Sequence, residues 1–222
     1  MMKIELSHQI TEVCPDLHVL AIEAKVQNTN YDAELWDEIK SIEEEIRTQG
    51  QLDQVNKIPA ILATRQAYKK LGKDPNRYRP SAESLHRRLH RGLPLYQINT
   101  LVDLINLISI RTGYSIGGFD ADKINGDLTL GVGRAGEIYH GIGRGELNIE
   151  GLPVYRDNIG GIGTPTSDEE RTKIDLTTSN LLMLINAYSG KSGLEETKNR
   201  TFSQLEKYVS ATDISARIIT SR

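Results

Sequence analysis

The chain has 222 residues, of which 38% are hydrophobic and 26% charged, with a formal net charge of −3. This composition is ordinary for a soluble globular protein, and the acidic balance argues against indiscriminate nucleic-acid binding. No apolar run approaches the roughly 18 residues of a transmembrane helix, the N-terminus lacks a signal-peptide core, and Cys14 has no second cysteine to pair with. We therefore expect a cytoplasmic protein with no membrane association and no cofactor.

The first half of the chain predicts one strand followed by four helices. Alternating apolar residues indicate the strand, and periodic apolar stripes indicate the helices. The expected N-caps are Asn28 or Thr29, Ser81 and Asn99, and Gly113 is the expected left-handed stop of the last helix. The expected ranges are 18–26 for the strand and 29–49, 59–72, 81–92 and 99–113 for the helices.

The second half changes to short strands separated by glycines. Strands are expected at 128–132, 137–142, 153–156, 172–177 and 181–187, followed by a helix at 194–209 and an edge strand at 214–219. The apolar run 180–188 is also compatible with a buried helix, because a short apolar run cannot decide between the two. Since the helices come first and the strands cluster later, the pattern predicts a single α+β domain.

Positive charge is concentrated between Lys69 and Arg91. This stretch holds eight basic and two acidic residues, a local charge of +6, so the remainder of the chain carries −9. Such a patch can steer a polyanion to one face of an acidic protein, although solvated helix faces explain it equally well. Within the stretch, Arg79, Arg87, Arg88 and Arg91 are the candidate nucleic-acid contacts.

Three further motifs carry weaker signals. Gly131–Gly136 has the G-x-G-x-x-G spacing of a dinucleotide loop, but the sequence after it alternates like a strand, which favours a hairpin. His86 and His90 share a helix face, but neighbouring arginines and the lack of a third ligand argue against a metal site. The polar loop 164–172 can hydrogen-bond a ligand, or it can be an exposed turn.

The stretch from Leu93 to Asp127 is the most informative part of the chain. It runs through a long apolar-periodic segment, breaks at Gly113 and continues into Gly117-Gly118-Phe119-Asp120, which we interpret as a glycine-lined acidic turn. This order of features predicts a core helix followed by a stretch of backbone that lines a pocket.

The same stretch resembles the editing region of the phenylalanyl-tRNA synthetase β subunit. The resemblance rests on Ile98-Asn99-x-x-Val102-Asp103-x-x-Asn106, on Gly113, and on Phe119-Asp120-x-Asp122-Lys123-Ile124. The glycine-rich turn Gly160–Gly163 and the apolar segment up to Ala187 resemble a second part of that region. The segment Tyr78–Glu83 resembles a group of free-standing proteins built from this domain alone, and the whole resemblance covers Pro59 to Tyr188.

The resemblance implies a compact α+β unit with a β-sandwich-like core of unusual topology, flanked by helices. In the synthetase this region hydrolyses tyrosine wrongly attached to phenylalanine tRNA. Carried over residue by residue, Asn106 matches an asparagine that helps to line the family's editing pocket, and Gly161 and Gly163 match the glycines of its second turn. These residues, together with Gly117 and Gly118, are the expected ligand pocket.

Two departures from the family pattern change the expected chemistry. The family's pocket histidine falls on Gly117, and the glutamate that recognises the tyrosine hydroxyl falls near Ile185. Without that carboxylate, selection for tyrosine over phenylalanine should weaken. Gly117 should open space for something larger, and the backbone amides of Gly117 and Gly118 should remain available to a ligand.

The resemblance predicts how the chain is divided into structural units and what the protein does. Residues 1–58 would be an N-terminal strand and helix packed on the main domain, residues 59–190 the synthetase-β-like tRNA-binding and editing domain, and residues 191–222 a C-terminal helix and edge strand of the same unit. The expected function is binding of tRNA or aminoacyl-tRNA, and the expected reaction, if the protein is an enzyme, is hydrolysis of mischarged aminoacyl-tRNA esters in trans.

Two other functions remain open on the sequence. The first is a non-catalytic module that binds an amino-acid-like small molecule. The second is an interaction protein whose Trp36 helix packs on a partner, although packing on the protein's own core explains the apolar stripe of that helix more simply. We do not expect a complete synthetase, because no aminoacylation motif is visible and the chain leaves no room for an ATP-using catalytic domain.

Overall fold

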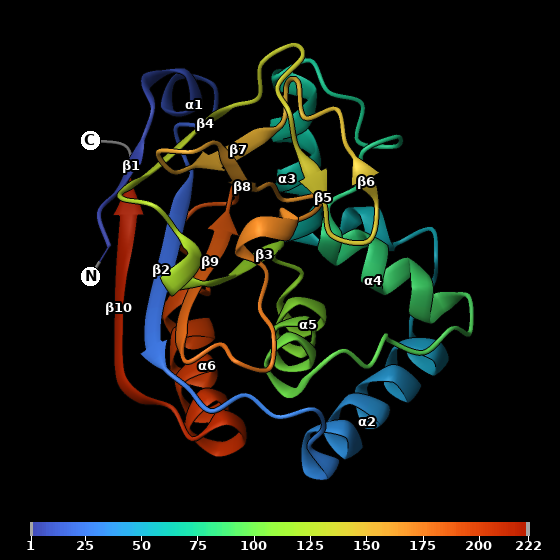
Figure 1. Cartoon of the computed structure of the whole chain (residues 1–222). Helices are drawn as coiled ribbons and strands as arrows, with labels where there is room; N and C mark the ends of the chain where they lie inside the picture. Colours follow the sequence, from blue (N-terminus) through green and yellow to red (C-terminus); the bar gives the residue numbers. More distant parts are fainter. Residues whose placement is uncertain (1, 221–222) are drawn as a thin grey trace.

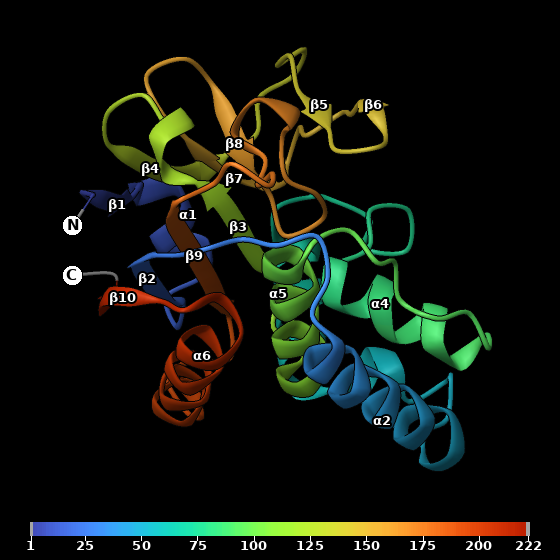
Figure 2. The same ribbon diagram turned by 60° about the horizontal axis from the view of Figure 1, so that its bottom comes forward.

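The computed structural model describes residues 2–220, which form two four-stranded sheets lying face to face and a layer of helices outside one of them (Figures 1 and 2). The strands are β1 (Ile4–Leu6), β2 (His18–Lys25), β3 (Ile116–Asp120), β4 (Leu128–Val132), β5 (His140–Gly141), β6 (Gly145–Glu146), β7 (Pro153–Arg156), β8 (Gly161–Gly163), β9 (Asn180–Ala187) and β10 (Thr212–Thr220). The α-helices are α1 (His8–Val13), α2 (Ala33–Gln49), α3 (Pro59–Lys70), α4 (Ser81–His90), α5 (Thr100–Thr112) and α6 (Leu194–Val209), and the 3-10 turns are η1 (Val55–Lys57), η2 (Ala121–Lys123) and η3 (Glu170–Thr172). The α+β class is confirmed.

Strand β9 lies inside the molecule and is buried on both faces. It belongs to the antiparallel sheet ordered β10-β2-β9-β3. Its side chains alternate, so that Leu181, Met183 and Ile185 pack toward the helices while Leu182 and Leu184 pack toward the other sheet. A strand covered on both faces has a continuous apolar sequence, which explains why the sequence alone did not separate strand from helix here.

The second sheet, ordered β1-β4-β7-β8, completes a sandwich-like core. Strand β1 pairs with β4 in parallel, whereas β7 pairs with β4 and with β8 in antiparallel fashion. Side chains such as Leu130, Tyr155 and Ile162 from this sheet pack against Phe119 and Leu184 from the first. The β-sandwich-like core that the resemblance implied is therefore present.

Helix α5 packs against the outer face of the first sheet, with α6 on one side of it and α2 and α4 on the other (Figure 2). It begins and ends as predicted, because the Asn99 Oδ1 accepts the Val102 N–H at 3.0 Å and Gly113 adopts a φ of 74°. Trp36 of α2 is buried in this layer, and its Nε1 donates to the Asp103 carboxylate at 2.9 Å. Trp36 therefore packs within the protein's own core and is not available to a partner.

Two predicted N-caps are wrong. Helix α2 begins at Ala33, because Asp32 caps it by accepting the Leu35 N–H at 2.8 Å, and the expected cap Asn28 instead donates to the Asp175 carbonyl. Ser81 is the first residue of α4 and makes no capping bond, since Pro80 occupies the N-cap position. Helix α2 therefore begins later than expected, whereas α4 begins at Ser81 itself with a different residue at its N-cap.

Several predicted strands are also corrected. The stretch 172–177 is not a strand, because Thr172 ends the 3-10 turn η3 and residues 176–177 form a turn in which the Asp175 side chain accepts the Thr177 N–H at 2.8 Å. The strand expected at 137–142 is reduced to β5, and β4 pairs with β1 and β7 rather than forming the expected hairpin with it. The Gly-Gly-Phe-Asp segment is strand β3, which pairs with β9, and not a turn. Strands β1 and β8 and helix α1 were missed.

Within residues 2–220, no helix combines the length and the apolar character needed to cross a lipid bilayer.

Candidate functional site

A pocket of ≈ 390 Å³ opens between the start of α4, helix α5, strand β3 and the loop that follows β8. Its polar lining includes Asn106 from α5 and Asp168 from the loop. A mostly apolar cavity with a few convergent polar groups is the usual composition of a small-ligand site. The apolar walls come mainly from Leu85, Ile98, Val102, Ile105, Ile116 and Ile174.

Asp168 brings a carboxyl group to this pocket without a compensating cation. Its Oδ2 accepts the Gly118 N–H at 3.2 Å, and no ion pair to it exists among residues 2–220, since the nearby Lys173 places its Nζ 2.6 Å from Glu170. Burial raises the pKa of Asp168 to about 8, against the opposing effect of the Gly118 N–H. The group is therefore largely protonated at neutral pH and can donate or accept a hydrogen bond.

Two glycines leave the space that the Asp168 carboxyl occupies. A Cβ atom at Gly163 would lie 2.9 Å from Asp168 Oδ1 and 2.5 Å from the Phe119 ring, and one at Gly117 would lie 2.7 Å from the same ring. The expectation that Gly117 opens the pocket is therefore wrong, because Phe119 and Asp168 fill that space. The expectation of a free amide at Gly118 is wrong as well, since its N–H already donates to Asp168.

Asn106 lies on the face of α5 that lines the pocket, together with Val102, Ile105 and Ser109. It is half-buried, and among the described residues nothing hydrogen-bonds its side-chain amide. By contrast, Ser109 uses its Oγ to donate to the Tyr114 carbonyl at 2.7 Å. The Asn106 amide therefore offers a free donor and a free acceptor to a ligand.

The polar loop that carries Asp168 is tightly held. The Thr164 Oγ1 accepts the Thr166 N–H at 3.2 Å and the Ser167 N–H at 3.1 Å, and the buried Tyr139 hydroxyl donates to the Ser167 carbonyl at 2.6 Å. Thr164 and Thr166 are buried, so the alternative of an exposed turn is wrong for this part of the loop. The loop fixes the position of Asp168 before any ligand arrives.

The remaining positions taken from the resemblance lie away from the cavity. Gly161 of β8 lies against Tyr139 and Val154 and does not line the pocket. Ile185 is fully buried on the helix side of β9 and pairs with Ile116. The pocket carboxyl of this chain therefore comes from Asp168, which sequence reasoning missed, and its only signal was its place in the polar loop after Gly163.

The four candidate arginines have different environments. Arg79 and Arg91 are exposed, and among residues 2–220 neither has an ion-pair partner. The Arg87 Nε donates to the buried Glu83 carboxylate at 2.7 Å, but Arg65 donates to the same carboxylate at 2.7 Å, so the charge of Arg87 is only partly compensated. The Arg88 Nε donates to the Pro94 carbonyl at 2.5 Å, and no carboxylate among residues 2–220 compensates its charge. Ser81 and Leu85 of α4 line the pocket, so Arg87 and Arg88 belong to a helix that borders it, while Arg79 precedes that helix and Arg91 caps its C-terminus.

The histidine pair and the glycine motif do not form the sites that their spacing allowed. His86 and His90 both line a small hollow beside α2, and burial lowers the pKa of His86 to about 4. Within the described part of the chain, no three His, Cys, Asp or Glu side chains gather as metal ligands. Gly131–Gly136 leads from β4 into a loop and then β5, so it lacks the helix N-terminus that binds a pyrophosphate.

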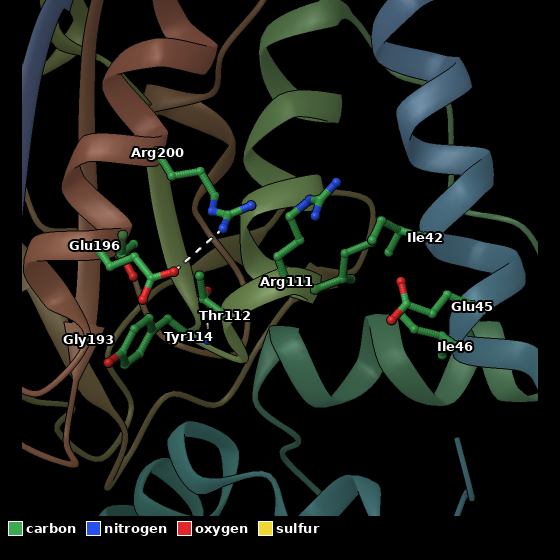
Figure 3. A pocket seen from close by; sticks show the side chains of 11 residues that line it. Ile42, Glu45, Ile46, Arg111, Thr112, Tyr114, Gly193, Glu196 and Arg200 are labelled. Carbon is green, nitrogen blue, oxygen red and sulfur yellow. Dashed lines mark hydrogen bonds and ion pairs between the residues drawn. The ribbon is translucent and has the colours of Figure 1, made fainter. Parts of the chain in front are cut away.

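A second hollow of ≈ 430 Å³ lies between α2, the end of α5 and the start of α6 (Figure 3). Arg111 and Arg200 both reach into it, but each has an acidic partner, since Arg111 lies 2.6 Å from Glu38 and Arg200 lies 3.5 Å from Glu196. None of the residues predicted as a site lines this hollow. We therefore place the candidate functional site at the pocket that contains Asp168, here called the Asp168 pocket.

Comparison with known proteins agrees with the resemblance described above. A family model described as "B3/4 domain" matches residues 63–212. The chain is 32% identical over 113 residues to the phenylalanine–tRNA ligase beta subunit of Bartonella henselae, a match that covers 46% of this chain and 13% of that protein. An N-terminal fragment of the phenylalanyl-tRNA synthetase beta subunit from Pyrococcus horikoshii shares the fold, with a TM-score of 0.50, 14% identity, and coverage of 99% of this chain and 54% of that one. Because the family model spans more than half of the chain, this protein belongs to the B3/4 domain family.

Proposed function

We propose that the protein binds tRNA or aminoacyl-tRNA and hydrolyses the ester of a mischarged tRNA in trans. One observation carries the proposal, namely that an apolar pocket of ≈ 390 Å³ is lined both by the Asp168 carboxyl and by the Asn106 amide, which have no cation and no hydrogen-bond partner, respectively, among residues 2–220. The similarity to the beta subunit of phenylalanine–tRNA ligase supplies the substrate class. The chain spans only 13% of that relative's length, so the proposed activity of this protein rests on the residues of its own pocket.

Ester hydrolysis in this pocket needs a base for water and a donor for the carbonyl oxygen. A carboxylate with a pKa of about 8 is a stronger base than an ordinary one, so ionised Asp168 can accept a proton from an attacking water. The Asn106 amide can donate to the oxygen that becomes negative as the water adds to the carbonyl carbon. The ester oxygen of the ribose then leaves the carbonyl carbon and takes the proton from Asp168 to become a hydroxyl. Asp168 returns to its ionised form.

Positive charge on α4 and next to both of its ends provides the contact with the RNA backbone. Arg79, Arg88 and Arg91 keep uncompensated positive charge, while the ion pair between Arg87 and the buried Glu83 makes Arg87 a weaker candidate for a phosphate contact. Phosphate contacts of this kind release counterions, so RNA affinity should fall steeply as the salt concentration rises. A filter-binding assay that shows no tRNA retention at low salt would sink the proposal.

The central test is deacylation of a set of mischarged tRNAs by the wild type and by Asn106→Ala. Because the Asn106 amide makes no bond within the described chain, the substitution should leave the fold intact and remove only a ligand contact. We expect the rate to fall about tenfold, the value of one hydrogen bond of about 1.4 kcal/mol. An unchanged rate would show that the pocket has been placed wrongly.

A second function, binding of a free amino-acid-like molecule without chemistry, is supported by the same carboxyl. Asp168 has no cation partner within residues 2–220, and the ammonium group of a small amino acid would supply one. A thermal-shift panel of amino acids separates the two functions, since a ligand that binds only the native state raises its melting temperature. A stabilising amino acid together with no effect of tRNA would favour this alternative.

A further inference from the structure

The segment between α4 and α5 exposes large apolar side chains beside the Asp168 pocket. Leu93 is 47% exposed, Tyr96 is 59% exposed and Ile98 is 53% exposed. Ile98 also lines the pocket. Two residues of chain span at most about 7 Å between Cα atoms, so Tyr96 lies close to the rim of the pocket.

A cation already covers the Tyr96 ring. The Arg88 guanidinium lies 3.7 Å from the ring centroid, and the Arg88 Nε is held by the Pro94 carbonyl at 2.5 Å. A guanidinium at this distance is attracted by the ring's negative face and limits the ring's rotation. Since more than half of Tyr96 remains exposed, the pair presents a flat, positively charged surface to solvent.

The backbone on both sides of Tyr96 is fixed. The Leu95 N–H donates to the buried Glu43 carboxylate at 2.6 Å, and the Ile98 N–H donates to Asp103 at 2.9 Å. Asp103 is itself held by the Trp36 indole. The exposed ring therefore lies on a rigid segment. A ligand that binds there does not have to pay the entropy cost of ordering this segment.

We propose that Tyr96, backed by Arg88, is a stacking platform for the terminal unpaired nucleoside of an acylated RNA. The proposal rests on the proposed function, because the ester that enters the Asp168 pocket is attached to that nucleoside's ribose. Aromatic rings beside arginine are the usual way in which proteins hold single-stranded bases, and stacking tolerates any base. The exposed Arg91, which caps the C-terminus of α4 and has no ion-pair partner among residues 2–220, supplies charge for the adjacent phosphate.

The test uses a synthetic acceptor-stem hairpin RNA whose 3′-terminal base is 2-aminopurine, carrying an amide-linked, non-hydrolysable aminoacyl group. Stacking on Tyr96 should quench the fluorescence of the base. We expect Tyr96→Ala to abolish the quenching and weaken binding about 5- to 150-fold, and Tyr96→Phe to retain both. Tyr31→Ala is the matched control, because Tyr31 is 45% exposed, does not line the pocket and has no cation on its ring.

The outcomes separate this proposal from the proposed function. If the wild type binds the RNA and Arg79→Ala weakens binding, but Tyr96→Ala changes neither affinity nor fluorescence, the platform is wrong and the function stands. If Tyr96→Ala and Tyr96→Phe lose affinity equally, the hydroxyl rather than the ring face makes the contact, which also overturns stacking. If the wild type does not bind the RNA at low salt, both proposals fail.

Discussion

The Asp168 pocket and the hollow between α2, α5 and α6 are similar in size but opposite in their electrostatics. The hollow holds two arginines, and each has a carboxylate within the chain. The Asp168 pocket holds a carboxyl with one backbone donor and no cation among residues 2–220, and an amide with no partner there. The paired arginines of the hollow need no ligand, whereas the carboxyl of Asp168, which has no cation among residues 2–220, has a free energy cost that a ligand can relieve. The difference explains why cavity size alone is a poor guide to the site.

The largest expected effect comes from removing the uncompensated carboxyl. Asp168→Ala should lower the deacylation rate at least about 100-fold, because it removes the group that accepts the proton from water. Single-turnover deacylation of a mischarged tRNA measures the effect, and RNA affinity should change little. Asp127→Ala is the control, since Asp127 is exposed and far from the lining of the pocket. Equal rates for Asp168→Ala and the wild type would remove Asp168 from the chemistry.

A smaller effect is expected on stability, and it should depend on pH. The pKa of Asp168 is raised by burial from 3.8 to about 8, so the folded state holds this proton more tightly than the unfolded state. The stability that this group contributes is therefore complete below pH 4 and is lost as the pH rises toward 8. Asp168→Asn removes this pH dependence. Its free energy of unfolding, measured relative to that of the wild type, should therefore rise by at least about 1.4 kcal/mol from pH 5 to pH 9. Urea unfolding at the two pH values measures this, and a constant difference would contradict the assigned shift.

The smallest effect is expected in the hollow between the helices. Arg200→Ala breaks a partly exposed pair with Glu196 at 3.5 Å, and such pairs contribute about 0–1 kcal/mol. We expect less than a twofold change in RNA binding and in deacylation. If Arg200→Ala instead reduces either of them as much as Asn106→Ala does, the functional site includes the hollow and the contrast between the two cavities is wrong.

The sequence predicted the regular elements well where local signals decide them. Helix α5 has its Asn99 cap and its Gly113 stop, and α6 and β2 lie within a residue of the expected ranges. Strands β3 and β8 were missed because they are short and rich in glycine, and only their pairing with β9 and β7 makes them strands. Local propensity is weak at such positions, and tertiary contacts override it.

The candidate site was predicted only in part, for a related reason. Asn106 and Gly118 both line the Asp168 pocket, because they belong to elements that the sequence located approximately. Asp168 comes from a loop distant in sequence from both, and nothing local marks it as different from Glu169 or Glu170 beside it. Its role depends on the close approach of Gly117, Gly118 and Gly163, which is a property of the folded chain alone.

The long-range pairing of β2 has a consequence for how the protein is made. His18 of β2 lies opposite Ala187 of β9, and β2 also pairs with β10, so this sheet joins segments from opposite ends of the described chain. At about 5–20 residues per second, a ribosome needs roughly 10–30 s to deliver β9 after β2 has emerged. During that interval β2 is an apolar strand without neighbours. An exposed apolar strand of this kind is prone to aggregate, so the yield of folded protein should depend on how well β2 is protected during synthesis.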